Sequence, residues 1–188
     1  KVTIPPTAYQ KTTLLGDIIK KDDIVMLITP VDSEAPDGRM ILPQAMAIRD
    51  VLDNHAVNIV LKETEVETFF KKTGIRPDLV ITDSQAFEFV YKIIPADIPL
   101  TGFSVVYAHM RGPFAEYIKG ARKLSDLRDG DRILILESCV HQVSCEDIGR
   151  CKIPAWIRKF SGKDLEFDVA AGLSEIQKPI TDYQLVVQ

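Results

Sequence analysis

The chain has 188 residues, of which 46% are hydrophobic and 27% are charged, and its formal net charge at pH 7 is −4. This composition is ordinary for a globular protein that buries a core, and the lack of a basic block argues against sequence-independent binding to nucleic acid. No apolar run approaches the roughly 18–20 residues that span a bilayer, and no signal-peptide pattern opens the chain, so we expect a cytoplasmic protein.

Strands and helices alternate through the first part of the chain. Nearly continuous apolar runs, which are typical of strands buried on both faces, predict strands at residues 24–29, 56–61, 79–82 and 100–107. Helical spacing predicts helices at 44–52 and 63–72 and a third that ends at Tyr91. This order favours right-handed βαβ crossovers and a mostly parallel sheet, and residues 109–113 (HMRGP) form a natural boundary.

A second unit follows the boundary. The pattern predicts a helix at 114–127, a strand at 133–137, a short helix at 153–160 and strands at 165–169 and 183–187. In the short helix we expect Trp156 and Phe160 to form one apolar face packed in the core. The predicted fold class is therefore α/β, with two small units that each have a mostly parallel sheet flanked by helices. The predicted domains are residues 1–112 and 113–188.

All three cysteines of the chain, Cys139, Cys145 and Cys151, lie close together after the strand at 133–137. An odd, clustered set in a cytosolic chain indicates metal ligands or a reactive thiol, whereas a disulfide framework would use an even number spread over the fold. The alternative is that they are small buried fillers, because free cysteine is often buried.

The stretch 137–156 (ESCVHQVSCEDIGRCKIPAW) contains the side chains that could bind a metal or react. Cys139 and His141 can turn toward one point, and Cys145 and Glu146 follow within reach. Thiolate and imidazole ligands suit either an iron–sulfur cluster or zinc. A stable cluster takes about four protein ligands, so the site is incomplete as it stands.

The same stretch carries a family resemblance. The sequence runs CVHQ at 139–142, DIGR at 147–150, and then Lys152-Ile153-Pro154 and Trp156. Upstream, EAPDGRMILPQ at 34–44, LVITDSQ at 79–85 and LTGFS at 100–104 match in the same order. Together these motifs resemble the dimerisation and cluster-binding domains of the HydF family, the GTP-binding scaffold proteins of FeFe-hydrogenase maturation.

The resemblance implies that residues 1–112 are a dimerisation domain and residues 113–188 a cluster-binding domain. It implies a 4Fe–4S cluster held by Cys139 and by cysteines expected beyond Gln188, with the fourth, exchangeable ligand from His141, Glu146 or Cys145. GTP and Mg²⁺ would belong to the family's N-terminal GTPase domain, and the phosphate-loop motif GxxxxGK[ST] is absent from this sequence. Cys151 falls at a position that is usually apolar in the family, so we expect it to be buried.

The implied function is that of a scaffold or carrier in hydrogenase maturation. Its partners would be a second copy of the chain, the radical maturase proteins and the apo FeFe-hydrogenase that receives the diiron subcluster. Two alternatives stay open: a zinc-dependent hydrolase that uses Cys139, His141 and Glu146, and a metal-free α/β binding module.

Overall fold

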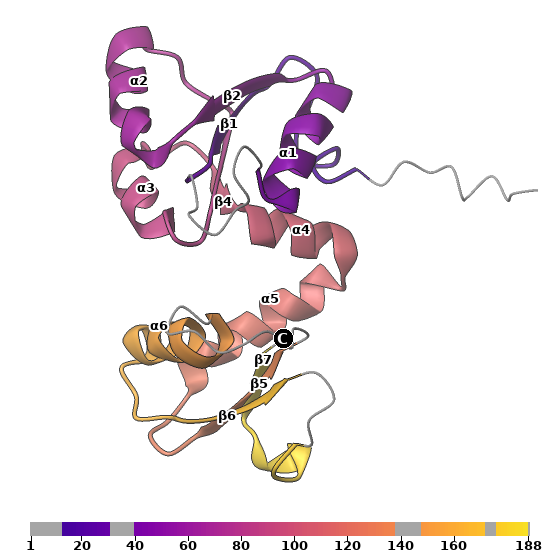
Figure 1. Ribbon diagram of the computed structural model, residues 1–188, viewed down its shortest axis with the longest axis vertical. Coiled ribbons are helices and arrows are strands. Elements are labelled where there is room, and N and C mark those ends of the chain that lie inside the picture. Colours follow the sequence, from indigo (N-terminus) through magenta and orange to yellow (C-terminus); the bar gives the residue numbers. More distant parts are fainter. Residues whose placement is uncertain (1–12, 31–39, 138–147, 172–175, 188) are drawn as a thin grey trace, which may run out of the picture. The chain divides into compact units, whose positions relative to one another are not determined.

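The computed structural model describes residues 13–30, 40–137, 148–171 and 176–187. It divides into two compact units, unit 1 at Lys1–Phe114 and unit 2 at Ala115–Gln188. Each unit is an α/β structure around a parallel sheet, as the sequence predicts (Figure 1).

Unit 1 contains a four-stranded parallel sheet in the order β2-β1-β3-β4. Its elements, in chain order, are β1 (Ile24–Ile28), α1 (Leu42–Asp53), β2 (Val57–Leu61), a 3₁₀ turn (Glu63–Glu65), α2 (Val66–Thr73), β3 (Leu79–Thr82), α3 (Phe87–Ile93), β4 (Leu100–Gly102) and α4 (Phe103–Arg111). β1 and β3 are the inner strands, which explains why their sequences are nearly continuous apolar runs.

Helices cover both faces of this sheet, with α2 and α3 on one side and α1 on the other (Figure 1). Side chains of alternate parity along the strands enter two separate cores. Val25, Leu27 and Ile81 pack with residues of α1 and α4, whereas Met26 and Val80 pack with residues of α2 and α3. The alternation follows from the pleat of a strand, in which successive side chains point to opposite faces.

The predicted strand at 100–107 is wrong beyond its first three residues. The chain is extended only at Leu100–Gly102, and α4 begins at Phe103. Phe103 and Val106 are 3% and 2% exposed, and Tyr107 and Met110 pack against the same core. These residues recur at helical spacing, so packing overrides the strand propensity of the two adjacent valines.

The first residues of the predicted boundary at 109–113 are helical, because His109 lies in the last turn of α4. Its Nε2 is 3.4 Å from Asp17 Oδ2, and its ring contacts the Phe114 ring edge-to-face at 5.0 Å between centroids. The helix ends at Arg111, before Gly112.

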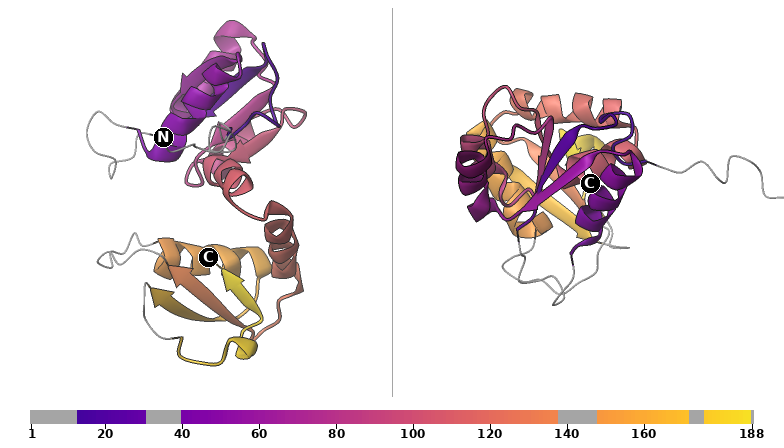
Figure 2. Two further views of the ribbon diagram at one scale, coloured as in Figure 1. Left: turned by 90° about the vertical axis from the view of Figure 1, so that its right-hand side faces the viewer. Right: turned by 90° about the horizontal axis from the view of Figure 1, so that it is seen from above.

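Unit 2 contains a three-stranded parallel sheet in the order β6-β5-β7. Its elements are α5 (Phe114–Arg122), a 3₁₀ turn (Lys123–Asp126), β5 (Arg132–Glu137), a π-helical turn η4 (Ile148–Lys152), α6 (Ile153–Ser161), β6 (Glu166–Ala171), a 3₁₀ turn (Ile180–Asp182) and β7 (Leu185–Val187). Figure 2 shows α6 lying against one face of this sheet.

The core of unit 2 forms mainly between α6 and that face. Ile133 of β5 and Ile157 of α6 are buried there with Leu127 and Leu165. On the opposite face of the sheet, a smaller cluster joins Leu134 to Ala170 and Tyr183. No helix in the part of the chain that the structure describes is long and apolar enough to cross a membrane.

Candidate functional site

The three strands of unit 2 end along one edge of the sheet, because they all run parallel. β5 ends at Glu137, β6 ends at its register partner Ala171, and β7 ends at Val187, which is aligned with Ile135. Ligands of open α/β sheets bind at the carboxyl edge, where loops and helix N-termini converge. This edge is therefore the candidate site of unit 2.

The predicted metal ligands follow this edge directly in the sequence. Cys139 is the second residue after Glu137, and His141, Cys145 and Glu146 come next. All four lie outside the described residues, so their roles stay predictions.

The chain returns to the end of β5 at Gly149, which is buried. A Cβ at this glycine would lie 1.7 Å from Oε1 and 2.5 Å from Cδ of Glu137, so only glycine leaves room for that carboxylate. The other carboxylate oxygen of Glu137 lies 3.8 Å from Nε of Arg150. Glu137 is therefore in contact with Gly149 and Arg150, which lie on the other side of residues 138–147 in the sequence.

The residue types at positions 139–146 fit a 4Fe–4S cluster, the group that the family resemblance implies. Thiolate, imidazole and carboxylate donors lie within one short stretch, and thiolate is the ligand that iron–sulfur clusters and zinc both accept. In residues 13–30, 40–137, 148–171 and 176–187, no group of three or more His, Cys, Asp or Glu side chains could hold a metal ion.

The expectation that Cys151 is buried is wrong. It lies in η4 as an exposed free thiol. The buried residues of α6, which follows η4, are Pro154 and Ile157. Cys151 is thus a cysteine close to the candidate site whose side chain the core does not require.

The expectation that Trp156 and Phe160 pack in the core is wrong as well. They lie one helical turn apart on α6 and are 44% and 67% exposed. The sequence correctly predicts that they share a face of the helix, but only part of the helix's apolar surface meets the sheet.

A polar contact joins the segment before β7 to β6. The Tyr183 hydroxyl donates to Asp168 Oδ2 at 2.8 Å. Burial and this hydrogen bond raise the pKa of Tyr183 above its ordinary value, because both favour the neutral phenol. Arg132 pairs with Glu166 on the neighbouring strand, and that hydrogen bond raises the pKa of Arg132. Both contacts tie strands together.

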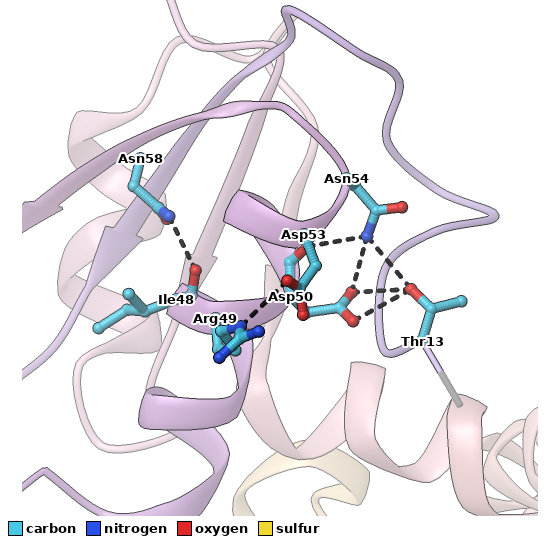
Figure 3. Close-up of polar contacts among 7 residues, drawn as sticks. All are labelled: Thr13, Ile48, Arg49, Asp50, Asp53, Asn54 and Asn58. Atoms are coloured by element: carbon cyan, nitrogen blue, oxygen red, sulfur yellow. Dashed lines mark hydrogen bonds and ion pairs between the residues drawn. The ribbon is translucent and has the colours of Figure 1, made fainter. Parts of the chain in front are cut away.

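Unit 1 has a second polar cluster, centred on Asp50 of α1 (Figure 3). Asp50 is only 8% exposed. Its Oδ2 accepts hydrogen bonds from the Thr13 hydroxyl at 2.9 Å, the Leu15 backbone N–H at 2.7 Å and Asn54 Nδ2 at 3.2 Å. The carboxylate therefore anchors the segment that precedes β1 to helix α1.

Sequence reasoning missed this cluster. The available signal was a carboxylate at a core-facing helix position, because Asp50 lies three residues after Ala47 and next to Val51, both fully buried. An open surface pocket of about 310 Å³ adjoins it, lined by Leu14, Leu42, Ala45, Met46, Arg49, Asp50 and Asp53.

Strand β2 is a long edge of the unit 1 sheet, and β1 is its only neighbouring strand in the described residues. Val57 N–H donates to Asp23, and the Leu61 carbonyl accepts from Thr29. Because backbone groups alternate sides along a strand, those of Asn58 and Val60 point away from β1. Val57 and Val60 are 50% and 43% exposed, and the strand contains no proline or charged residue to protect its edge.

The two units each match a known family model. The description of the first is the hydrogen maturase F dimerization domain, over residues 14–112, and that of the second is the hydrogen maturase F tetramerization domain, over residues 115–188. A search of curated proteins found no match. The first model alone spans more than half of the chain, and so the chain belongs to the hydrogen maturase F (HydF) family of hydrogenase maturation proteins, with domains of that family that associate with further copies.

Proposed function

We propose that this chain is part of a scaffold that holds a 4Fe–4S cluster and helps to assemble the diiron subcluster and deliver it to apo FeFe-hydrogenase. The observation that carries the proposal is the convergence of the three strand ends of unit 2, with Cys139 two residues beyond the central strand β5. The proximity of Gly149 to Glu137 supports it, because it brings the two sides of the segment that contains Cys139 to the end of β5.

Cys139 would bind one iron of the cluster, together with cysteines expected after Gln188. His141, Glu146 or Cys145 would supply the fourth, weakly held ligand. When bound, the cluster would offer an iron with a displaceable ligand, to which the diiron cargo could attach. Cys139 would hold the cluster, and whichever of His141, Glu146 or Cys145 supplies the fourth ligand would be displaced by the cargo.

The radical maturases and apo-hydrogenase are the proposed partners, and the cytoplasm is the proposed compartment, where thiols stay reduced. GTP and Mg²⁺ would act in a GTPase domain of the family. Nucleotide state could alter assembly only by changing the relative free energies of the states that it binds.

We infer that unit 1 dimerises through β2. A twofold axis perpendicular to the sheet would pair the two copies of β2 antiparallel and join two four-stranded sheets. The outward backbone groups of Asn58 and Val60 would then find partners, and the exposed side chains of Val57 and Val60 would lose contact with water.

The test of cluster binding compares two cysteines of one neighbourhood. In anaerobic reconstitution of the full-length protein, Cys139→Ala should lose most of its iron and acid-labile sulfide, whereas Cys151→Ala should retain them because Cys151 is not a proposed ligand. Elemental analysis and electron paramagnetic resonance measure both. Undiminished 4Fe–4S content in Cys139→Ala would overturn the assignment, and stoichiometric zinc without sulfide would favour a zinc hydrolase instead.

A further inference from the structure

The Glu137 carboxylate fills the space that a side chain at Gly149 would take, although residues 138–147 separate the two in sequence. A Cβ at Gly149 would lie 1.7, 2.5 and 2.9 Å from Oε1, Cδ and Cγ of Glu137, all closer than the 3.0 Å below which real Cβ contacts essentially never fall. Gly149 is buried, and only 18% of the Glu137 side chain is exposed. The missing side chain at Gly149 is therefore what lets this carboxylate lie where it does, at the end of β5.

Backbone conformation does not explain the glycine at this position. Gly74, Gly130 and Gly162 have positive φ values, which favour glycine, whereas Gly149 does not. Other residue types could adopt the backbone of Gly149, so room for Glu137 is the feature that requires glycine there.

The second carboxylate oxygen of Glu137 lies near a cation. Its Oε2 is 3.8 Å from Nε of Arg150, the residue after Gly149. A carboxylate that is largely removed from water is costly unless opposite charge or hydrogen bonds compensate it, and Arg150 supplies opposite charge. Two consecutive residues thus hold the Glu137 side chain, Gly149 by its shape and Arg150 by its charge.

We propose that these three residues, Glu137, Gly149 and Arg150, form a clasp that positions the cluster ligands of the segment between them, with Glu137 as the positioning residue. This step rests on the proposed function, in which Cys139 binds iron. Cys139 follows Glu137 by two residues, so their Cα atoms are at most about 7 Å apart in any conformation. Groups that orient metal ligands without touching the metal commonly change metal affinity about 10- to 100-fold.

The clasp lowers the entropy cost of binding the cluster. A twelve-residue chain as flexible as a glycine-rich linker has a root-mean-square end-to-end distance of about 17–21 Å, whereas Glu137 and Gly149 are in contact. A closed clasp brings these two sides together before the cluster binds, so fewer conformations are lost on binding. By linkage, a bound cluster must favour the closed clasp by the same free energy.

The clasp can be opened without unfolding unit 2. Ile153 and Ile157 of α6 pack in the core with Ile133 of β5, and that packing does not involve Glu137. The nearest atoms that a Cβ at Gly149 would meet belong to the far end of a flexible side chain, so Gly149→Ala should turn Glu137 away and leave the backbone in place. Glu137→Ala opens the same clasp without adding an atom, and it carries the test if Gly149→Ala does not fold.

The test measures how fast the reconstituted full-length protein loses iron to the chelator ferrozine under anaerobic conditions. Gly149→Ala and Glu137→Ala should each lose iron about tenfold faster than the wild type. Glu137→Gln keeps the shape of the side chain and loses only its charge, so it should lose iron at most about threefold faster, because an ion pair with a partly exposed partner contributes little.

Gly120→Ala is the matched control. It is the same substitution on α5 of the same unit, and a Cβ at Gly120 would meet nothing within 4 Å, so its rate of iron loss should equal that of the wild type. The double variant Glu137→Ala with Gly149→Ala should lose iron no faster than either single variant, because each change removes the same contact.

Urea denaturation of the metal-free protein separates positioning from stability. The unfolding midpoint should change little in the clasp variants, even though they lose iron faster. A wild-type rate of iron loss in folded Glu137→Ala would overturn the proposal. It would also be overturned by rates that simply follow the midpoint across the variants, because the contact would then only stabilise the fold.

The proposed function fails by a different result. Undiminished iron and sulfide in Cys139→Ala would overturn the cluster assignment, and the role of the clasp with it. Loss of the cluster from Cys139→Ala, together with wild-type iron loss in Gly149→Ala and Glu137→Ala, would overturn the clasp alone.

Discussion

The two units solve the burial of a parallel sheet differently. In unit 1, helices lie on both faces, and four of the five residues of β1 are fully buried, Val25 through Ile28. In unit 2, the sheet has three strands, and its larger core lies on the α6 face. The second cluster of unit 2 contains only three buried residues, Leu134, Ala170 and Tyr183.

This difference determines what each unit can offer to another copy. A sheet that is covered on both faces has its edge left for association, and in unit 1 the unprotected edge is β2. Unit 2 instead presents apolar helix surface on α6, because its small sheet covers only part of that helix. The two units therefore leave chemically different surfaces exposed, a strand edge in unit 1 and apolar helix surface in unit 2.

The largest effect on stability should come from Asp50, and it should be confined to unit 1. Asp50→Ala leaves the Leu15 N–H and the Thr13 hydroxyl without their shared acceptor, and we expect it to lower the free energy of unfolding by about 2–3 kcal/mol. Urea denaturation followed by circular dichroism measures the loss, and the fluorescence of Trp156, the single tryptophan, reports on unit 2.

Glu67→Ala is the control for this change, because Glu67 makes an exposed ion pair with Lys71 on α2 and should leave the midpoint near that of the wild type. The two units would not be independent if Asp50→Ala shifted the unfolding of unit 2 by the same amount.

The next largest effect should be on dimerisation, and it tests whether unit 1 associates through the edge strand β2. Val60→Pro removes an N–H that points away from β1, so the unit's own sheet keeps its hydrogen bonds while the dimer loses two. We expect the dimer dissociation constant to rise about 10- to 100-fold, at roughly 1 kcal/mol for each lost hydrogen bond plus steric conflict. Analytical ultracentrifugation measures it.

Val60→Thr keeps both the N–H and the branched side chain, and it should remain dimeric. A Val60→Pro protein that is folded and still fully dimeric would show that unit 1 associates through a surface other than β2.

The smallest effect should be on the stability of unit 2 at alkaline pH, and it comes from Tyr183 in the cluster with Leu134 and Ala170. Burial and Asp168 raise the pKa of Tyr183, so this residue contributes stability below its ordinary pKa of about 10 and that contribution is lost as pH rises through the raised value. Tyr183→Phe cannot ionise and should make the unfolding midpoint of unit 2 less sensitive to pH above about 10.

The measurement is a series of thermal melts across alkaline pH, followed by Trp156 fluorescence. Tyr91→Phe serves as the control because Tyr91 is 69% exposed and should leave the pH dependence unchanged. Equal alkaline sensitivity in wild type and Tyr183→Phe would show that the Tyr183–Asp168 contact does not contribute to the stability of unit 2.

The strands buried on both faces were the most predictable part of the fold. Apolar runs such as IVMLI and RILILE predict inner strands from the local sequence alone. The side chains on both faces of such a strand are buried, so consecutive residues are apolar. The strand end that Cys139 and His141 follow was predictable for the same local reason, whereas their assignment as metal ligands stays a prediction.

Residues whose environment depends on distant segments were not predictable. Phe103 and Val106 become helical because they pack against a core that includes Val51 of α1. Asp50 becomes a buried acceptor only because Thr13 and Leu15 return to it from 37 and 35 positions away. The local sequence carries only a weak signal for each outcome: helical spacing of apolar residues in α4, and a carboxylate beside buried Ala47 and Val51 in α1.

The sequence by itself determined the α/β class, the order of the strands along the chain and the family, because periodicity and short motifs are local properties. Tertiary structure decided how much of the apolar surface of α6 is covered and which edge of β2 stays unpaired. Both depend on how much surface a neighbouring element covers, and that quantity exists only once the chain has folded.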